Sequence, residues 1–181
     1  MKTATKIVLI LLALTSLAAA RKRDPLTEAE ADQLRDVRME PLKRFKLFIK
    51  FTDARLDSID QLRSDPKQTE GRAAKTHDLL EDFSELVDEI NNNLDTFETE
   101  AMDKDQRKQY RKAVKEVVTA CDRWSTRLRG LRNAIQMDPQ IRAESKDYAF
   151  ALQDAEDTLK STVELARGYS EEKDQDKPDK K

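Results

Sequence analysis

The sequence contains few of the residues that end or crosslink secondary structure, with three glycines, five prolines and a single cysteine among 181 residues. Sheet-rich folds need many turns, which glycine and proline usually supply, so their scarcity argues against such folds. A lone cysteine cannot form an internal disulfide bond, so packing alone must hold the chain together. These absences favour an all-α fold.

Residues for catalysis are also scarce, because the chain has one histidine, His77, and one cysteine, Cys121. The cysteine lies within a helical stripe of apolar residues, where a thiol is buried and inert. No Cys-x-x-Cys-His motif is present for haem attachment. The histidine and the carboxylates of Glu81 and Glu85 lie on the outer side of their predicted helix, as a solvated stripe does. We therefore expect no enzymatic activity, no metal site and no cofactor.

Charged residues are abundant but balanced, with 34 lysines and arginines against 36 aspartates and glutamates. Two of the lysines lie in residues 1–20, so the chain without this segment has 32 basic and 36 acidic side chains, a net charge of −4. Nucleic-acid binding requires a concentrated basic surface. The mildly acidic balance therefore argues against nucleic acid as a partner.

The start of the sequence is typical of a signal peptide. Two lysines precede an apolar stretch at residues 7–17, and three alanines at 18–20 supply the small side chains that a signal peptidase accepts. The apolar stretch is shorter than the about 20 residues that span a membrane. We expect cleavage after residue 20 and export, to a bacterial periplasm or out of the cell. The three cations at 21–23 oppose translocation, and an uncleaved membrane anchor is the alternative.

Apolar residues recur at alternating steps of three and four in four long segments, which is the period of an amphipathic helix. A short linker at 21–25 precedes them, and the segments span residues 27–64, 69–99, 103–137 and 138–168. The clearest apolar stripe belongs to the third segment and comprises Tyr110, Val114, Val117, Cys121, Trp124, Leu128, Leu131 and Ile135. Short connections make consecutive helices antiparallel. The sequence predicts an elongated antiparallel bundle of about four long helices, as a single domain over residues 26–170.

Capping residues mark the starts of three of these helices. Thr27 with Glu30, and Asp103 with Gln106, have the spacing of a capping box. Asp138 precedes a proline, as an N-cap residue often does. These local patterns predict helix starts at 27, 103 and 138.

The other boundaries depend on helix-breaking residues. Pro41 lies inside the first segment and predicts a kink or a break there. Neither glycine nor proline separates the second segment from the third, so a turn within residues 98–109 and a continuous helix are both open. Gly168 is expected to cap the fourth helix. Residues 171–181 are dominated by charged side chains and predict a disordered tail.

One stretch of the first helix is dense in both aromatic and basic residues. On a helical wheel Leu47 and Phe51 point away from the apolar stripe, among cations. The predicted interaction patch comprises Lys43, Arg44, Leu47, Lys50 and Phe51. Apolar side chains ringed by cations suit contact with an acidic protein or, more weakly, with anionic lipid headgroups. The alternative is that this helix buries a wide face, with residues 26–38 folded back over it.

These features give two hypotheses for the function. The first is a non-enzymatic, exported helical-bundle protein that acts through protein–protein or envelope-surface contacts, with another protein as its partner. The alternative is a carrier that holds a small apolar ligand or cofactor between its helices, in a pocket lined by Tyr110, Trp124 and Tyr148. Core packing is the simpler role for these aromatic residues.

Overall fold

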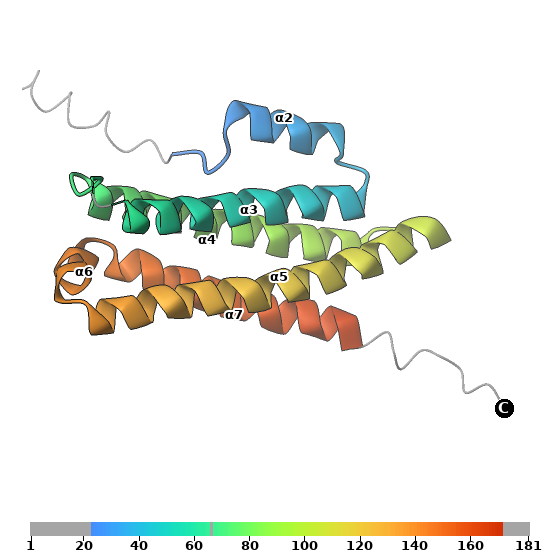
Figure 1. Ribbon diagram of the computed structural model, residues 1–181. Coiled ribbons are helices and arrows are strands. Elements are labelled where there is room, and N and C mark those ends of the chain that lie inside the picture. The colour runs from blue at the N-terminus through green and yellow to red at the C-terminus, as the bar shows by residue number, and fades with distance from the viewer. Residues whose placement is uncertain (1–22, 66, 172–181) are drawn as a thin grey trace, which may run out of the picture.

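The computed structural model describes residues 23–65 and 67–171, and in this part of the chain every regular element is a helix (Figure 1). The long helices are α3 (Pro41–Ser64), α4 (Arg72–Thr99), α5 (Lys104–Met137) and α7 (Ala149–Glu171). Two short helices, α2 (Glu28–Asp36) and α6 (Pro139–Glu144), and a 3-10 turn, η2 (Ser145–Asp147), complete the described part of the chain. The prediction of an all-helical bundle is confirmed. The expected signal peptide (1–20) and tail residues 172–181 lie outside the described residues.

The four long helices surround one core in an order that differs from their order in the chain. α3 packs against α4 and α5, and α7 packs against the same two helices, so α4 and α5 occupy opposite corners (Figure 1). Neighbouring helices in bundles lie about 8–10 Å apart. The four residues that connect α4 to α5, 100–103, extend to about 13 Å and can therefore cross the diagonal.

The helices alternate in direction along the chain. At one end of the bundle Phe45 of α3, Phe97 of α4 and Tyr110 of α5 meet, with ring centroids 5.9, 6.3 and 6.4 Å apart. Tyr169, near the end of α7, reaches the same region and donates its hydroxyl to Asp95 Oδ1 of α4 at 2.6 Å. Consequently α3 and α5 are parallel neighbours, α4 and α7 are parallel neighbours, and the two pairs run in opposite directions.

Trp124 of α5 lies in the core and is fully buried. Its ring meets that of Phe83 from α4 edge-to-face at 5.8 Å, and its Nε1 donates to Asp53 Oδ1 of α3 at 2.7 Å. Burial also raises the pKa of the Cys121 thiol to about 12, as expected for an inert cysteine. Seven residues of the predicted α5 stripe, from Tyr110 to Leu131, are buried. The eighth, Ile135, is partly buried against the core.

The helix starts follow the local sequence. Both predicted capping boxes are present, at Thr27 and at Asp103, and Asp138 accepts from the first turn of α6. Residues 37–40 separate α2 from α3, and Pro41 is the first residue of α3, so the break predicted there is confirmed. The connection at 100–103 rules out the continuous-helix alternative. Gly71 precedes α4 with φ of 67°, a left-handed conformation that glycine adopts at little cost.

Two sequence predictions at the C-terminal end are wrong. The expected single helix from 138 is divided into α6, η2 and α7. At the division the Ser145 hydroxyl donates to the Arg142 carbonyl at 2.9 Å, a local bond that competes with helix continuation. Gly168 lies inside α7, which continues to Glu171. The bond from Tyr169 to α4 holds this last turn in place.

Candidate binding surface

Charge is distributed unevenly among the four long helices. α3 has six basic and three acidic residues, and α5 has ten basic and three acidic residues. α4 has two lysines and arginines against eight acidic residues, and α7 has two against five. Two helices are therefore basic and two are acidic, although the whole chain is nearly neutral.

The packing order of the bundle places helices of like charge side by side. The basic pair, α3 and α5, are neighbours on one side, and the acidic pair, α4 and α7, are neighbours on the other (Figure 1). If α4 and α5 were adjacent, as consecutive helices in a simple bundle are, each side would mix the two signs. The crossing at residues 100–103 therefore gives the protein two faces of opposite charge.

The cations of α3 and α5 fall into two groups. Toward the α6 end, α3 carboxylates neutralise the arginines of α5, since Arg123 binds Asp53 at 2.7 Å and Arg127 binds Asp57 and Asp60 at 2.8 and 2.6 Å. Toward the other end, Lys43 pairs with Glu40, the residue that precedes its own helix. Lys46 lies 3.7 Å from Glu116 of α5. The first half of both helices is thus richer in unpaired positive charge than the second half.

We call this region the basic face. It consists of Lys43, Lys46 and Lys50 of α3 and Lys104, Lys108, Arg111, Lys112 and Lys115 of α5. All but Arg111 are lysines, and all eight are exposed. On α5 most of these cations lie on the helix side of Asp122, which bonds Arg167 of α7, whereas Lys46 of α3 lies beside Glu116. Within the described chain, the five α5 cations make no ion pair.

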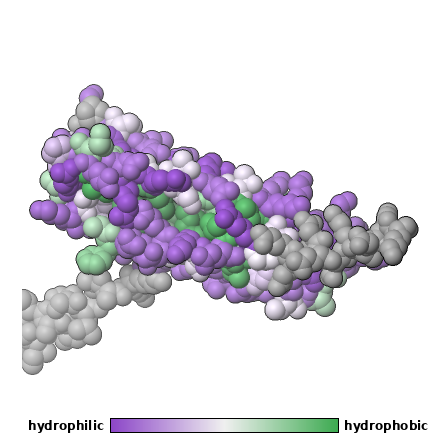
Figure 2. All heavy atoms as spheres, turned by 90° about the horizontal axis from the view of Figure 1, so that it is seen from below, coloured by the Kyte–Doolittle hydropathy of each residue, from purple (hydrophilic) through white to green (hydrophobic). Residues whose placement is uncertain are grey.

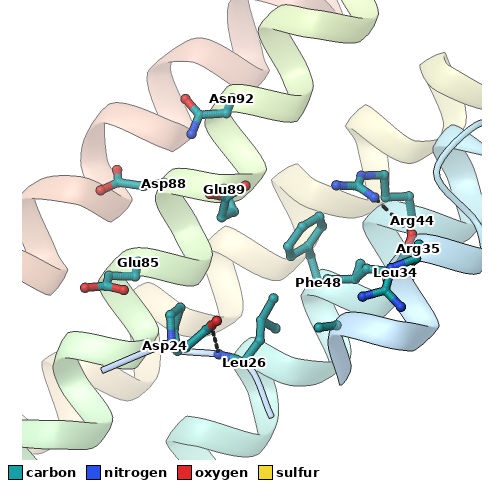
Figure 3. A pocket seen from close by; sticks show the side chains of 12 residues that line it. Asp24, Leu26, Leu34, Arg35, Arg44, Phe48, Glu85, Asp88, Glu89 and Asn92 are labelled. Atoms are coloured by element: carbon teal, nitrogen blue, oxygen red, sulfur yellow. Dashed lines mark hydrogen bonds between the residues drawn. The ribbon is translucent and has the colours of Figure 1, made fainter. Parts of the chain in front are cut away.

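The opposite side carries the acidic face, which consists of Glu81, Glu85 and Asp88 of α4 and Asp154, Asp157 and Glu164 of α7. Five of these are exposed and Glu85 is half-buried. Glu85 and Asp88 of α4 line the same groove as Arg44 and Phe48 of α3 (Figure 3). The acidic face, like the basic one, spans two parallel helices.

The predicted apolar patch is not exposed as expected. Phe51 is only 3% exposed, and Leu47 is partly buried against the core. Arg44 turns away from the basic face, donating to Asn93 Oδ1 at 2.5 Å and to the Leu34 carbonyl at 3.0 Å. The structure instead matches the alternative predicted from the sequence, in which the segment before Pro41 folds back along α3. Of the five predicted residues, Lys43 and Lys50 remain at the surface and belong to the basic face.

Arg55 fastens this folded segment to the bundle. Its guanidinium donates to both carboxylate oxygens of Glu30 at 2.8 and 2.7 Å and to the Pro25 carbonyl at 2.5 Å. It also lies 3.6 Å from Asp82 of α4. Desolvation opposes ionisation of Glu30, but the bonds from Arg55 and Thr27 outweigh it and lower the pKa of Glu30. The pKa of Asp82 is raised, because the effect of burial exceeds that of the bond from Arg23, which lowers it.

Replacing Arg55 with alanine is expected to release α2 from α3 while the four-helix core stays folded. Bonds to charged groups contribute about 1.5–3 kcal/mol, so amide exchange across α2 should accelerate at least about tenfold. Hydrogen exchange resolved by mass spectrometry measures this. Arg35→Ala is the matched control, because Arg35 pairs with Asp32 within α2 and both are exposed. Equal protection of α2 in the two variants would contradict the anchoring role of Arg55.

The attachment of α2 through the contact between Arg55 and Glu30 should also depend on pH. Because the folded pKa of Glu30 lies below its ordinary value of 4.5, its stabilising effect is present above that value and is lost as the pH falls through the folded pKa. The native protein should therefore lose α2 protection below pH 4.5, after correction for intrinsic exchange rates.

The histidine and two nearby carboxylates, which have the chemistry of metal ligands, form a small surface cluster. His77 Nδ1 lies 3.7 Å from carboxylate oxygens of both Asp78 and Glu81. Glu85 is one turn further along and belongs to the acidic face. Asp78 is already bonded by Arg23 at 3.2 Å, and the three ligand atoms lie on an open helix surface. The arrangement is that of a solvated polar stripe.

Two of the grooves on the described surface border α2 and α5. One, of about 610 Å³, lies between α2 and helices α3 and α4, with Leu34 and Phe48 in its floor (Figure 3). Its lining mixes four carboxylates with two guanidinium groups. The other, of about 350 Å³, lies between α5 and α7 over Leu128 and Leu159. Figure 2, which views the bundle from the α5 and α7 side, shows a narrow hydrophobic strip within a hydrophilic surface.

The aromatic residues of the carrier hypothesis lie elsewhere. Tyr110, Trp124 and Tyr148 are all buried in the core, and none of them lines either groove. Tyr110 donates its hydroxyl to the Leu94 carbonyl at 3.0 Å, which satisfies its polar group. Core packing therefore accounts for their positions.

No protein-family model, curated protein or solved structure gave a significant match to this chain. Among the helices of the described residues, none is both long and apolar enough to cross a membrane. The surface charge and the packing of this chain are therefore the observations from which a function can be proposed.

Proposed function

We propose that this chain is a non-enzymatic, exported helical-bundle protein that binds an acidic protein partner through its basic face. The observation that carries the proposal is the excess of exposed cations in the first halves of α3 and α5, two helices that pack against each other. Complementary charge of this kind directs a partner to one surface and speeds its association.

The size of the basic face favours a compact acidic partner. Its α5 cations, from Lys104 to Lys115, extend about 16 Å along the helix axis. Beyond them the carboxylates of Asp53, Asp57 and Asp60 lie on the same side of the bundle and already pair with α5 arginines. A flat anionic membrane would meet these carboxylates as well. An acidic helix or a small acidic patch would not.

The proposal of export is based on the sequence of residues 1–20, with its short apolar stretch and three alanines. The lone cysteine is compatible with an oxidising compartment, because Cys121 is buried and its pKa is raised. A bacterial periplasm or the extracellular medium fits both features.

Binding of the purified protein to immobilised poly-L-glutamate, compared with its binding to phosphatidylglycerol vesicles, tests the proposal. We expect retention on poly-L-glutamate that is lost near about 0.3 M salt, where the screening length falls to about 6 Å. We expect weaker sedimentation with the vesicles. Preference for the vesicles would instead assign the basic face to anionic lipid, and failure to bind either probe would overturn the proposal.

A further inference from the structure

We infer that an acidic segment of this chain, residues 172–176, docks on the cations of α5 and competes there with the acidic partner. The competition rests on the proposed function, whereas the docking is a contact within one molecule. The segment itself lies outside the described residues. It directly follows α7, whose end beside α5, together with the length and charge of the segment, supports this contact.

α7 ends beside the row of α5 cations. Arg167 of α7 bonds Asp122 of α5 at 3.0 Å, so the two helices are level at this pair. At about 100° per residue, four of the five α5 cations lie within about 40° of Asp122 around the helix: Lys104, Lys108, Arg111 and Lys115. α5 also extends beyond the end of α7 (Figure 1). Chain that continues past α7 therefore enters the space beside these cations.

The segment is long enough to reach the cations. Glu171, where α7 ends, lies four residues beyond Arg167 and thus about 6 Å further toward the start of α5. From that level Lys115 is about 5 Å and Lys108 about 15 Å further along α5, at about 1.5 Å per residue. Five extended residues span up to about 17 Å. Residues 172–176 can therefore cover α5 from Lys115 to Lys108.

The charge and the spacing of the segment suit these cations. Glu172, Asp174 and Asp176 occupy alternate positions, so in an extended chain all three point to the same side, about 6.6 Å apart. The α5 cations repeat at steps of three and four residues, about 4.5–6 Å along the helix axis. The segment has these three carboxylates and one lysine, a net charge of −2. Each carboxylate can thus meet a cation of α5.

The lysines that follow the segment also have counterparts on α5. Three of them come after the carboxylates: Lys177, Lys180 and Lys181. The exposed side chains of Asp103 and Asp105 lie at the start of α5, beyond most of its cations. Because the segment runs against the direction of α5, its lysines approach these aspartates after its carboxylates have passed the cations. The two charge patterns are therefore complementary in order.

The tether to α7 makes a weak contact effective. A short flexible tether holds a segment at an effective concentration in the millimolar range, so a contact with a millimolar Kd is occupied much of the time. An acidic partner then binds only those molecules whose α5 cations are free, and its apparent affinity falls by that fraction. The segment thereby sets a lower limit on the charge of a partner that can displace it.

Paramagnetic broadening in nuclear magnetic resonance spectra tests the docking. A spin label on the Gln175→Cys variant leaves the three carboxylates in place, and Cys121 is buried away from the label reagent. At about 0.02 M salt the label should broaden the amide signals of residues 108–115. At about 0.5 M most of this broadening should disappear, because the screening length falls from about 20 Å to about 4 Å.

The matched sample for the spin label carries E172Q/D174N/D176N in addition to Gln175→Cys. It has the same tether without the three carboxylates, so residues 108–115 should be broadened less at low salt. Equal broadening in the two samples would mean that the tether alone brings the label near α5, and it would overturn the docking.

Binding to poly-L-glutamate tests the competition. Without the label, E172Q/D174N/D176N should bind at least about threefold more tightly than the native protein at low salt, as expected if the segment occupies the cations in about two-thirds of the molecules. The control E28Q/E70Q/D154N neutralises three exposed carboxylates elsewhere and changes the net charge equally, so it should tighten binding much less. Equal tightening in both variants would assign the effect to net charge and overturn the competition.

The two measurements separate this inference from the proposed function. If the native protein and E172Q/D174N/D176N bind poly-L-glutamate with equal affinity, the proposed function stands and the competition is wrong. If neither binds, the proposed function is wrong and the competition falls with it. Broadening that depends on the three carboxylates would then support the docking alone.

Discussion

Replacing Trp124 with alanine is expected to lower the free energy of unfolding by about 3–5 kcal/mol, the range for truncating a large aromatic residue in a core. Trp124 is fully buried and packs edge-to-face on Phe83 across the bundle, so its removal leaves a cavity between α4 and α5. It also removes the donor to Asp53 of α3. The side chain thus joins three of the four long helices. Chemical denaturation followed by far-ultraviolet circular dichroism measures the change.

Two matched variants separate these contributions. Trp124→Phe keeps an aromatic ring against Phe83 but removes the donor and part of the buried indole, so a smaller loss than that of Trp124→Ala is expected, because Asp53 keeps its bond to Arg123. Glu81→Ala alters an exposed side chain and should change stability by less than about 0.5 kcal/mol. A Trp124→Ala variant as stable as Glu81→Ala would show that the core is assigned incorrectly.

Reversing three charges of the basic face should weaken binding to poly-L-glutamate by at least about tenfold at low salt, since repulsion replaces attraction at the contact. The variant is K108E/K112E/K115E. These side chains are exposed and make no ion pair within the described residues, so the melting temperature should change by no more than about 2 °C. Binding is measured by biolayer interferometry, and stability by thermal denaturation.

The control for net charge is K67E/K75E/K146E, which reverses three exposed lysines elsewhere. It changes the total charge by the same amount and should retain most of the binding. Equal weakening in both variants would mean that total charge governs the interaction, and the basic face would lose its special role.

Local features of the fold could be predicted from the sequence because they depend on residues close together in the chain. The apolar stripe of α5 requires only a helical period, and the capping boxes at Thr27 and Asp103 require side chains three residues apart. The break before Pro41 follows from its missing backbone donor. The split between α6 and α7 was not predictable in this way, because no glycine or proline marks residues 145–148.

The candidate surface was only half predictable, because exposure depends on what covers a helix. The cations Lys43 and Lys50 were identified correctly as surface residues, whereas Phe51 is buried. The segment before Pro41 folds back along α3 and is held there by Arg55, which bonds a residue 25 positions away. Helical periodicity shows which side of a single helix is apolar. It does not predict contacts between segments that are distant in the sequence.

The α5 cations were missed for a related reason. Lys104, Lys108, Lys112 and Lys115 resemble an ordinary solvated stripe when α5 is considered alone. They become part of a larger surface only because α3, with its own lysines, lies beside α5. The uneven charge of the four segments was visible in the sequence and could have indicated two-sided charge, but the order of helices around the core could not be deduced from it.

The adjacency of α3 and α5 underlies both faces, and zero-length crosslinking tests it most directly. A carbodiimide joins a lysine amine to a carboxylate in contact with it, and peptides from the monomer band of a denaturing gel identify the pair. We predict a crosslink between Lys46 and Glu116, whose Nζ and Oε1 atoms lie 3.7 Å apart. Absence of this crosslink, together with crosslinks within the monomer from Lys112 or Lys115 to carboxylates of α4, would contradict the arrangement.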